Sequence, residues 1–147
     1  MKKLLLIFLL IPFISLGQKN YSMKFNHQAL LVNDLNLSGY FYKNILGFEE
    51  IEVGAGQNPP KRWFKSDDGM EIHLISTNKK LKSIPKGVHM AFSVKNFDLF
   101  IDNLSINKVK YSNWIGNENQ IQIRKDGYKQ VFFQDPQGYW IEVNNVN

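Results

Sequence analysis

The repeat that decides the fold begins with HQALLVND, residues 27–34, and returns as HMAFSVKN, residues 89–96. Histidine, alanine and valine recur 62 residues apart, and each copy ends on a residue that can cap a helix, Asp34 or Asn96. A constant offset between matching residue types predicts that one supersecondary unit occurs twice. The repeat also places a histidine at the same position of both units.

The residues after each copy predict the same order of elements. In the first unit a strand at 25–33 leads into a helix from Leu35 to Leu46, which Gly47 ends. Three strands then follow, at 48–53, 62–65 and 70–75. The second unit is predicted to contain a strand at 88–94, a helix at 97–104, and strand pieces at 111–115, 120–124, 130–134 and 139–144. The chain is therefore predicted to be an α+β protein of two βαβββ modules.

Both modules are expected to belong to one domain, residues 18–147, with modules at about 24–76 and 87–145. The chain has 147 residues, of which 44% are hydrophobic, enough for a single core but not for two independent ones. Residues 76–86 are polar and basic, and we interpret them as a solvated linker.

The first 17 residues differ from the rest and are predicted to be a signal peptide. Lys2 and Lys3 precede an apolar run at 4–16, and small residues follow before Gln18. An uncleaved membrane anchor is the alternative, although the run is shorter than the ~20 residues that a spanning helix needs. The protein is thus expected to be exported, to the periplasm or outside the cell, with no stable membrane span after cleavage.

The composition argues against nucleic acid as a partner and against disulfides as a source of stability. The formal net charge is +5, and part of it lies on the two lysines of the leader, so the charge does not argue for nucleic-acid binding. No cysteine is present, so no disulfide supports the exported domain. A bound ion could add stability instead.

The three histidines, His27, His73 and His89, all fall in predicted strands. Alternate strand residues share a face, so His73 lies with Glu71, and Glu142 lies on the polar face of the last strand. Imidazole and carboxylate groups suit Zn, Ni, Fe(II), Mn or Co. Any one of these histidines could instead be an ordinary hydrogen-bonded residue, and Glu142 could be an edge-strand charge that discourages pairing.

Three stretches resemble the glyoxalase/bleomycin-resistance/extradiol-dioxygenase superfamily, also called the vicinal-oxygen-chelate class. They are the opening run at 27–35 with the downstream LGF at 46–48, the second-module start GVHMAFSV at 87–94, and the terminal signature FQDPQGYWIE at 133–142. The likeness covers about residues 24–145.

The resemblance implies a cup of curled mixed sheet around one divalent metal ion of unknown identity. The implied ligands are His27, His89 and Glu142, with a fourth from the strand at 70–75. Alternation cannot separate Glu71 from His73; we favour His73 as the ligand and Glu71, with Glu142, as the carboxylates that could move a proton. The family also builds sites across two chains, so a homodimer is compatible with this ligand set.

Aromatic residues and arginines near these strands are candidates for a substrate pocket. The pocket prediction rests on Trp63, Trp114, Arg124 and Phe132; further candidates are Arg62, Phe64, Tyr128 and Tyr139. The aromatic residues could instead be ordinary core, and the arginines could simply be solvated.

The resemblance implies a metal-dependent lyase or isomerase that chelates two neighbouring oxygens of a small substrate. Glutathione-dependent glyoxalase I has an arginine where this chain has Leu31, which argues against that activity. The alternatives are a metal-free protein that sequesters drugs and an extradiol-type dioxygenase.

Overall fold

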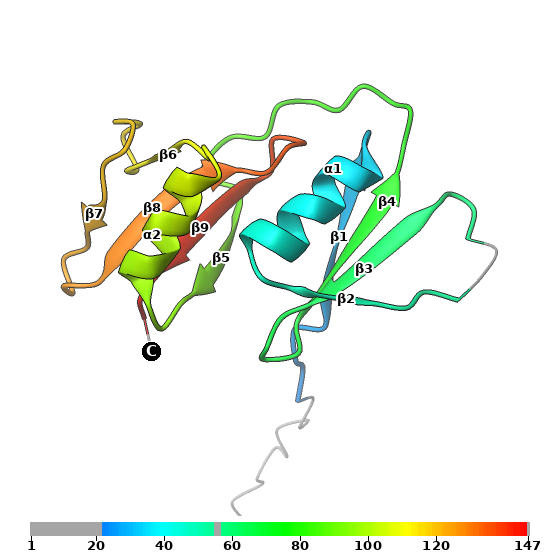
Figure 1. The fold of residues 1–147 in the computed structure, drawn as a ribbon, viewed down its shortest axis with the longest axis horizontal. Helices are drawn as coiled ribbons and strands as arrows, with labels where there is room; N and C mark the ends of the chain where they lie inside the picture. Colours follow the sequence, from blue (N-terminus) through cyan, green and yellow to red (C-terminus); the bar gives the residue numbers. More distant parts are fainter. Residues whose placement is uncertain (1–21, 55–56, 147) are drawn as a thin grey trace, which may run out of the picture.

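The computed structural model describes residues 22–54 and 57–146, and Figure 1 shows two sheets side by side. The first module contains β1 (His27–Val32), α1 (Leu35–Tyr40), η1 (Phe41–Ile45), β2 (Glu49–Ile51), β3 (Lys61–Lys65) and β4 (Glu71–Ser76). Its sheet has the order β1-β4-β3-β2, with β1 parallel to β4 and the other pairs antiparallel.

The second module repeats this plan with one extra short strand. It contains β5 (His89–Ser93), α2 (Phe97–Ile106), β6 (Tyr111–Ser112), β7 (Gln122–Ile123), β8 (Lys129–Gln134) and β9 (Trp140–Asn144). Its sheet has the order β5-β9-β8-β6, β7 also pairs with β8, and β5 is parallel to β9. The predicted α+β class with two βαβββ modules is confirmed.

The predicted helix caps form in both modules. The side chain of Asp34 accepts from the backbone N–H groups of Asn36 and Leu37, and that of Asn96 accepts from Leu99. The first helix differs from the prediction, because it widens after Tyr40 into the π-helical turn η1, in which the Leu46 N–H donates to the Phe41 carbonyl at 3.1 Å. This turn directs Phe41 and Tyr42 into the core.

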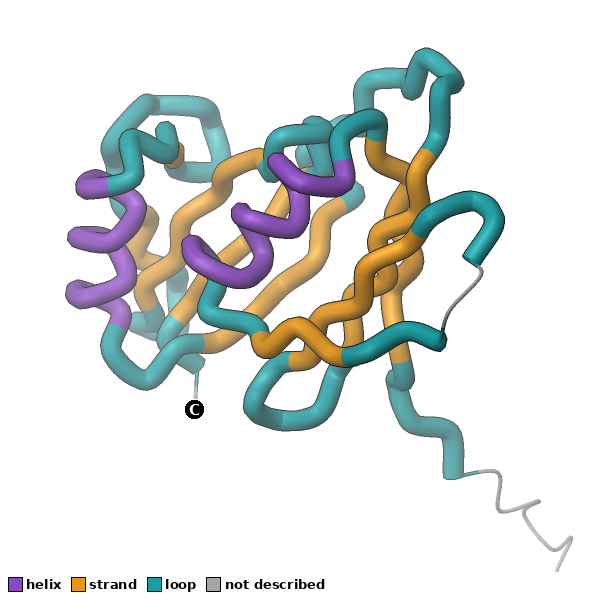
Figure 2. The backbone as a smooth tube through the Cα atoms, turned by 45° about the vertical axis from the view of Figure 1, so that its right-hand side comes forward, coloured by secondary structure: helices purple, strands orange, loops and turns teal. Residues whose placement is uncertain are grey.

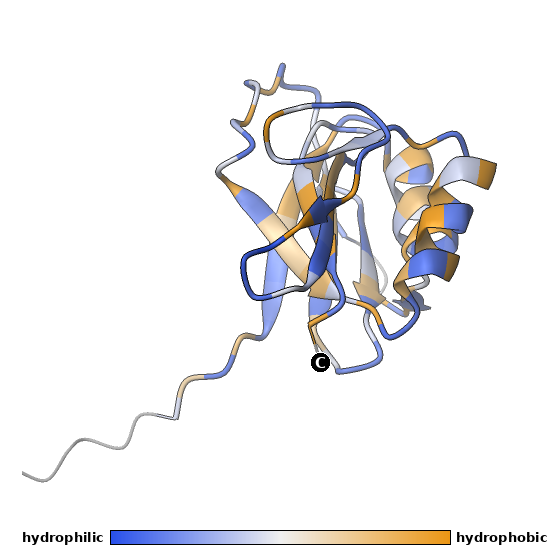
Figure 3. Ribbon diagram, turned by 90° about the vertical axis from the view of Figure 1, so that its left-hand side faces the viewer, coloured by the Kyte–Doolittle hydropathy of each residue, from blue (hydrophilic) through white to orange (hydrophobic). Residues whose placement is uncertain are grey.

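Both helices cover the same side of the sheets (Figure 3). The core lies on this side and is shared by the two modules: Phe41 of η1 packs near Phe133 of β8, and Phe48 packs edge-on to Phe92 of β5. Figure 2 shows the strands of the two modules as neighbouring groups, with the helices along one side of them. We call the opposite side of each sheet the helix-free face. Strand alternation places all of the predicted metal ligands on it.

A buried hydrogen bond joins the two modules. The Tyr42 hydroxyl donates to Oδ2 of Asp135 at 3.0 Å, and the other oxygen of Asp135 accepts from the N–H groups of Gln137 and Tyr139. Burial raises the pKa of Asp135, whereas these hydrogen bonds oppose that rise. Asp135 therefore orders the β8–β9 turn and fastens it to the first module.

Replacing Tyr42 with phenylalanine should lower the free energy of unfolding by about 1–3 kcal/mol, because a buried carboxyl group loses a donor. Urea unfolding measures the change. Tyr40→Phe is the matched control, since Tyr40 is exposed and its hydroxyl makes no hydrogen bond to the described residues. Equal stability of the two variants would contradict this account.

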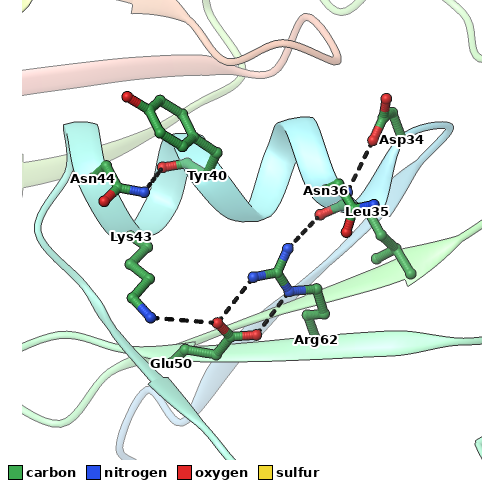
Figure 4. Close-up of polar contacts among 8 residues, drawn as sticks. All are labelled: Asp34, Leu35, Asn36, Tyr40, Lys43, Asn44, Glu50 and Arg62. Carbon is green, nitrogen blue, oxygen red and sulfur yellow. Dashed lines mark hydrogen bonds and ion pairs between the residues drawn. The ribbon is translucent and has the colours of Figure 1, made fainter.

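Arg62 ties β3 to β2 and to the start of α1 (Figure 4). Its guanidinium donates to both carboxylate oxygens of Glu50, at 2.7 and 2.9 Å, and to the Leu35 carbonyl at 3.1 Å. The suggested substrate-binding role of Arg62 is therefore replaced by a structural one. Gly39 leaves room for this arrangement, since a Cβ at that position would overlap the guanidinium and displace it.

The hydrogen bond from Arg62 lowers the pKa of Glu50 below its ordinary value of 4.5. Stabilisation by ionised Glu50 is thus present above pH 4.5 and is lost as the pH falls through the lower pKa of the folded state. Arg62→Met should cost about 1–2 kcal/mol at neutral pH and remove this acid-dependent component. Unfolding curves collected from about pH 7 to about pH 2 measure it. Lys43→Met is the control, because Lys43 lies 3.8 Å from the carboxylate and is half exposed.

The predicted signal peptide lies outside the described residues. Within the described ranges, no helix combines the length and the apolar character that spanning a bilayer would require.

Candidate functional site

His89 and Glu142 form a close pair on the helix-free face of the second sheet. His89 begins β5 and Glu142 lies in β9, where it is opposite Ala91 in the parallel ladder. The His89 Nε2 and Glu142 Oε2 atoms are 3.4 Å apart, and Glu142 is only 8% exposed. An imidazole and a nearly buried carboxylate therefore face each other.

Each member of this pair is held by a second contact. The Lys86 carbonyl can only accept, so its 2.8 Å contact with His89 Nδ1 makes that nitrogen the donor. In the neutral imidazole, Nε2 then carries the lone pair. Asn144 Nδ2 donates to Glu142 Oε1 at 2.8 Å. The two remaining atoms, Nε2 and Oε2, can each ligate a metal ion, and they lie 3.4 Å apart.

The first sheet carries the matching group, a stack of three rings. His27 lies on His73 with ring centroids 4.2 Å apart, and His73 lies on Trp63 at 4.0 Å, both nearly parallel. The His27 Nδ1 contacts the side-chain oxygen of Asn26 at 2.6 Å, which leaves its Nε2 with the lone pair, as in His89.

His73 differs from His27 and His89 in its hydrogen bonding. Its Nε2 lies 2.8 Å from Glu71 Oε2, and a carboxylate can only accept, so this nitrogen donates. His73 is also enclosed between two rings and is 9% exposed. The ring of His73 is therefore less available than that of His27 to ligate a metal ion.

The strand register shows how the two modules correspond. His73 lies opposite Ala29, and Glu142 lies opposite Ala91, and these alanines are matched in the repeat. His73 is thus the positional equivalent of Glu142. Strand alternation in the sequence could not decide whether His73 or Glu71 held that position.

The predicted ligands form two pairs, not one cluster, within a single chain. In residues 22–54 and 57–146, no three His, Cys, Asp or Glu side chains are close enough together to hold one metal ion. His89 with Glu142 and His27 with His73 are therefore two half-sites on separate sheets.

The predicted pocket residues divide in the same way. Phe132 is buried beneath the second half-site, with its ring 5.4 Å from that of His89 and 5.5 Å from that of Trp114. Trp63 belongs to the first half-site. Arg124 is bidentate to Asp126, and this hydrogen bond chiefly raises its pKa, with a smaller contribution from the Glu142 charge.

The remaining aromatic candidates are used elsewhere. Phe64 is in the core, Tyr139 bonds the backbone of Leu31, and the Arg124 guanidinium lies 5.9 Å from the ring of Tyr128.

Lys86 contacts the second half-site through its carbonyl, and the sequence did not reveal this, because its position in a basic run suggested a solvated linker. Its ammonium donates to Ser112 Oγ and to the carbonyls of Asn113 and Trp114, and lies 4.7 Å from the ring of Trp140. Burial lowers its pKa. Lys86 fixes the segment that carries Trp114, and it borders a pocket of about 530 Å³ together with Phe132 and Trp140.

Comparisons with known proteins agree with this architecture. The chain is 27% identical over 137 residues to "Glyoxylase I 4" of Arabidopsis thaliana, covering 89% of this chain and 75% of that protein. A glyoxalase/dioxygenase from Nostoc punctiforme has 25% identity and a TM-score of 0.70, covering 90% of this chain and 97% of that one.

A fosfomycin resistance protein, FosX, from Listeria monocytogenes shares the fold, with 20% identity, a TM-score of 0.67 and coverage of 85% and 94%. Residues 24–143 match the family model for the Glyoxalase/Bleomycin resistance protein/Dioxygenase superfamily. With its two βαβββ modules and its matched half-sites, the chain belongs to this superfamily, the vicinal-oxygen-chelate class.

Proposed function

We propose that this protein is a metal-dependent enzyme of the lyase or isomerase type, acting on a small substrate with two neighbouring oxygens. The observation that carries the proposal is the pair of His89 Nε2 and Glu142 Oε2, 3.4 Å apart and each oriented by a second hydrogen bond. Two oriented donor atoms of these types fit Zn, Ni, Fe(II), Mn or Co.

Further ligands would come from a second copy of the chain. His27 is exposed, and its Nε2 makes no hydrogen bond to the described residues, so in a homodimer the first half-site of one copy could complete the second half-site of the other. A twofold axis would then make two equivalent sites. His73 would be the fourth ligand or, given its bond to Glu71, part of the wall beside the metal.

When bound, the ion would supply Lewis-acid stabilisation of an oxyanion on the substrate. The residues of the chain would do the rest: Phe132 and Trp114 exclude water around His89, and Glu71 or Glu142 moves a proton. Glu71 is suited to this role because the bond from His73 Nε2 holds its carboxylate on the helix-free face. We also propose that the protein works after export.

Metal analysis and titration of the purified mature protein test the proposal. We expect about one divalent ion per chain and reversible loss with chelator. A protein that binds no divalent ion would overturn the proposal and favour the metal-free alternative, a binding protein that uses the pocket beside Phe132 and Trp140. Stoichiometric iron together with ring-opening activity would favour the dioxygenase alternative.

A further inference from the structure

The pocket of about 530 Å³ beside the second half-site combines aromatic walls with an ammonium group. Phe41, Phe132 and Trp140 supply aromatic walls, and the ring of Phe132 also lies 5.4 Å from that of His89. Lys86 supplies the ammonium group. A pocket of this size accommodates a small molecule, and aromatic walls favour a ligand with a flat ring.

The charge of Lys86 has no counter-charge on the part of the chain that the structure describes. Burial lowers the pKa of Lys86, and no carboxylate raises it. The acidic side chains that line the same pocket have other partners. Glu118 lies 3.4 Å from the Lys110 ammonium. Asp135 accepts from the Tyr42 hydroxyl and from two backbone N–H groups. A part-buried cation without a counter-charge favours an anion in the space beside it.

The hydroxyl of Ser112 supplies a hydrogen-bond donor in this pocket. Its Oγ accepts from the Lys86 ammonium at 3.1 Å, and its own proton is donated to none of the residues in 22–54 and 57–146. Ser112 is only 9% exposed and lines the pocket. The other two hydrogens of the ammonium go to the carbonyls of Asn113 and Trp114. An anion in the pocket would therefore accept from Ser112 and be attracted by the charge of Lys86.

The strand register separates Ser112 from the carboxylate of the second half-site. Ser112 pairs with Phe132, and Phe132 pairs with Glu142, so the three residues form one row across neighbouring strands. Two strand spacings, about 10 Å, separate the backbones of Ser112 and Glu142. An anion bound at Ser112 would thus lie beyond contact with Glu142.

We propose that this pocket binds an aromatic carboxylate, which accepts from the Ser112 hydroxyl beside Lys86 and packs its ring against Phe132 and Trp140. The proposal goes beyond the proposed function, because none of these residues is a predicted metal ligand and the binding requires no metal ion. A neutral ring would leave the charge of Lys86 unbalanced, and an anion without a ring would leave the aromatic walls uncovered.

Equilibrium dialysis of the mature protein with naphthoate tests the proposal, before and after removal of metal with a chelator. Naphthamide is the neutral probe of the same shape, and hexanoate is an anion without a ring. Naphthoate should bind about 10-fold more tightly than either of these probes, with or without chelator. Lys86→Met should reduce naphthoate binding to the level of naphthamide.

Ser112→Val is a second variant, which puts a methyl group in place of the hydroxyl and keeps the contacts of Lys86 with the two carbonyls. It should weaken naphthoate binding by about 10-fold, and circular dichroism checks that both variants are folded. Lys82→Met is the control, since Lys82 is an exposed lysine of the same linker. It should bind naphthoate like the parent protein.

Equal affinities of the parent protein for naphthoate and naphthamide would overturn the proposal. Unchanged naphthoate binding by the folded Lys86→Met and Ser112→Val variants would also overturn it. Loss of naphthoate binding on chelation would do the same, because the probe would then have bound to the metal ion. Metal analysis decides the proposed function separately, so either proposal can fail while the other stands.

Discussion

Replacing His89 with alanine is expected to lower the affinity for a divalent metal by about 100-fold or more, a larger effect than loss of a residue that only orients a ligand. The variant removes Nε2, one of the two oriented donor atoms, and leaves Glu142 with no partner across the pair. Competition with a chromophoric chelator measures the affinity. The fold should persist, because His89 lies on the helix-free face, away from the shared core.

Ser93→Ala provides the control, since Ser93 lies on the same strand and face as His89 and is exposed. It should bind metal like the parent protein. If His89→Ala kept the parental affinity, the His89–Glu142 pair would not be a metal site, and the proposed function would fail at its central observation.

Mixing two inactive variants should restore about a quarter of the metal sites if the half-sites combine across a homodimer. The variants are His27→Ala and His89→Ala, each defective in both sites of its own dimer. If the two variants are unfolded and refolded together, about half of the dimers would be mixed, with one chain of each variant. Each mixed dimer would have one site with both histidines and one site with neither.

This experiment separates a shared site from one that forms within a chain. Sites within one chain would show no restoration, because every chain in the mixture lacks one histidine. Refolding each variant alone is the control, and ultracentrifugation checks that the refolded chains are dimers. Full restoration is impossible, because each mixed dimer has only one complete site. Recovery well above a quarter would point to a different arrangement of the ligands.

Much of the fold could be predicted because the repeat and strand alternation are local properties of the sequence. His27 and His89 start parallel strands, Asp34 and Asn96 cap the helices, and the Asp135–Gly138 turn joins β8 to β9, all as expected. The π-helical turn was missed, because helical spacing does not distinguish it from an α-helix that continues to Leu46. Strands 111–115 and 120–124 are each reduced to two residues, since neighbouring polar side chains bond within the loop.

The candidate site was predicted in residue type but not in arrangement. The repeat singled out His27 and His89, and the family resemblance added His73 and Glu142. Neither could show that these residues lie in two pairs on separate sheets. The distance between sheets depends on packing around Phe41 and Tyr42, which no strand pattern encodes. Lys86 was missed for a related reason: a lysine in a basic run looks solvated until the fold places Trp140 against it.

The separation of the two sheet faces has a consequence for evolution. The residues that maintain the fold, such as Ile72, Leu74, Ile141 and Val143, alternate along the strands with those that face the half-sites. Mutations at the latter positions can exchange a ligand or a substrate contact with little effect on the packed interior. A lineage built on this plan can therefore acquire new chemistry by small steps without first losing a stable protein.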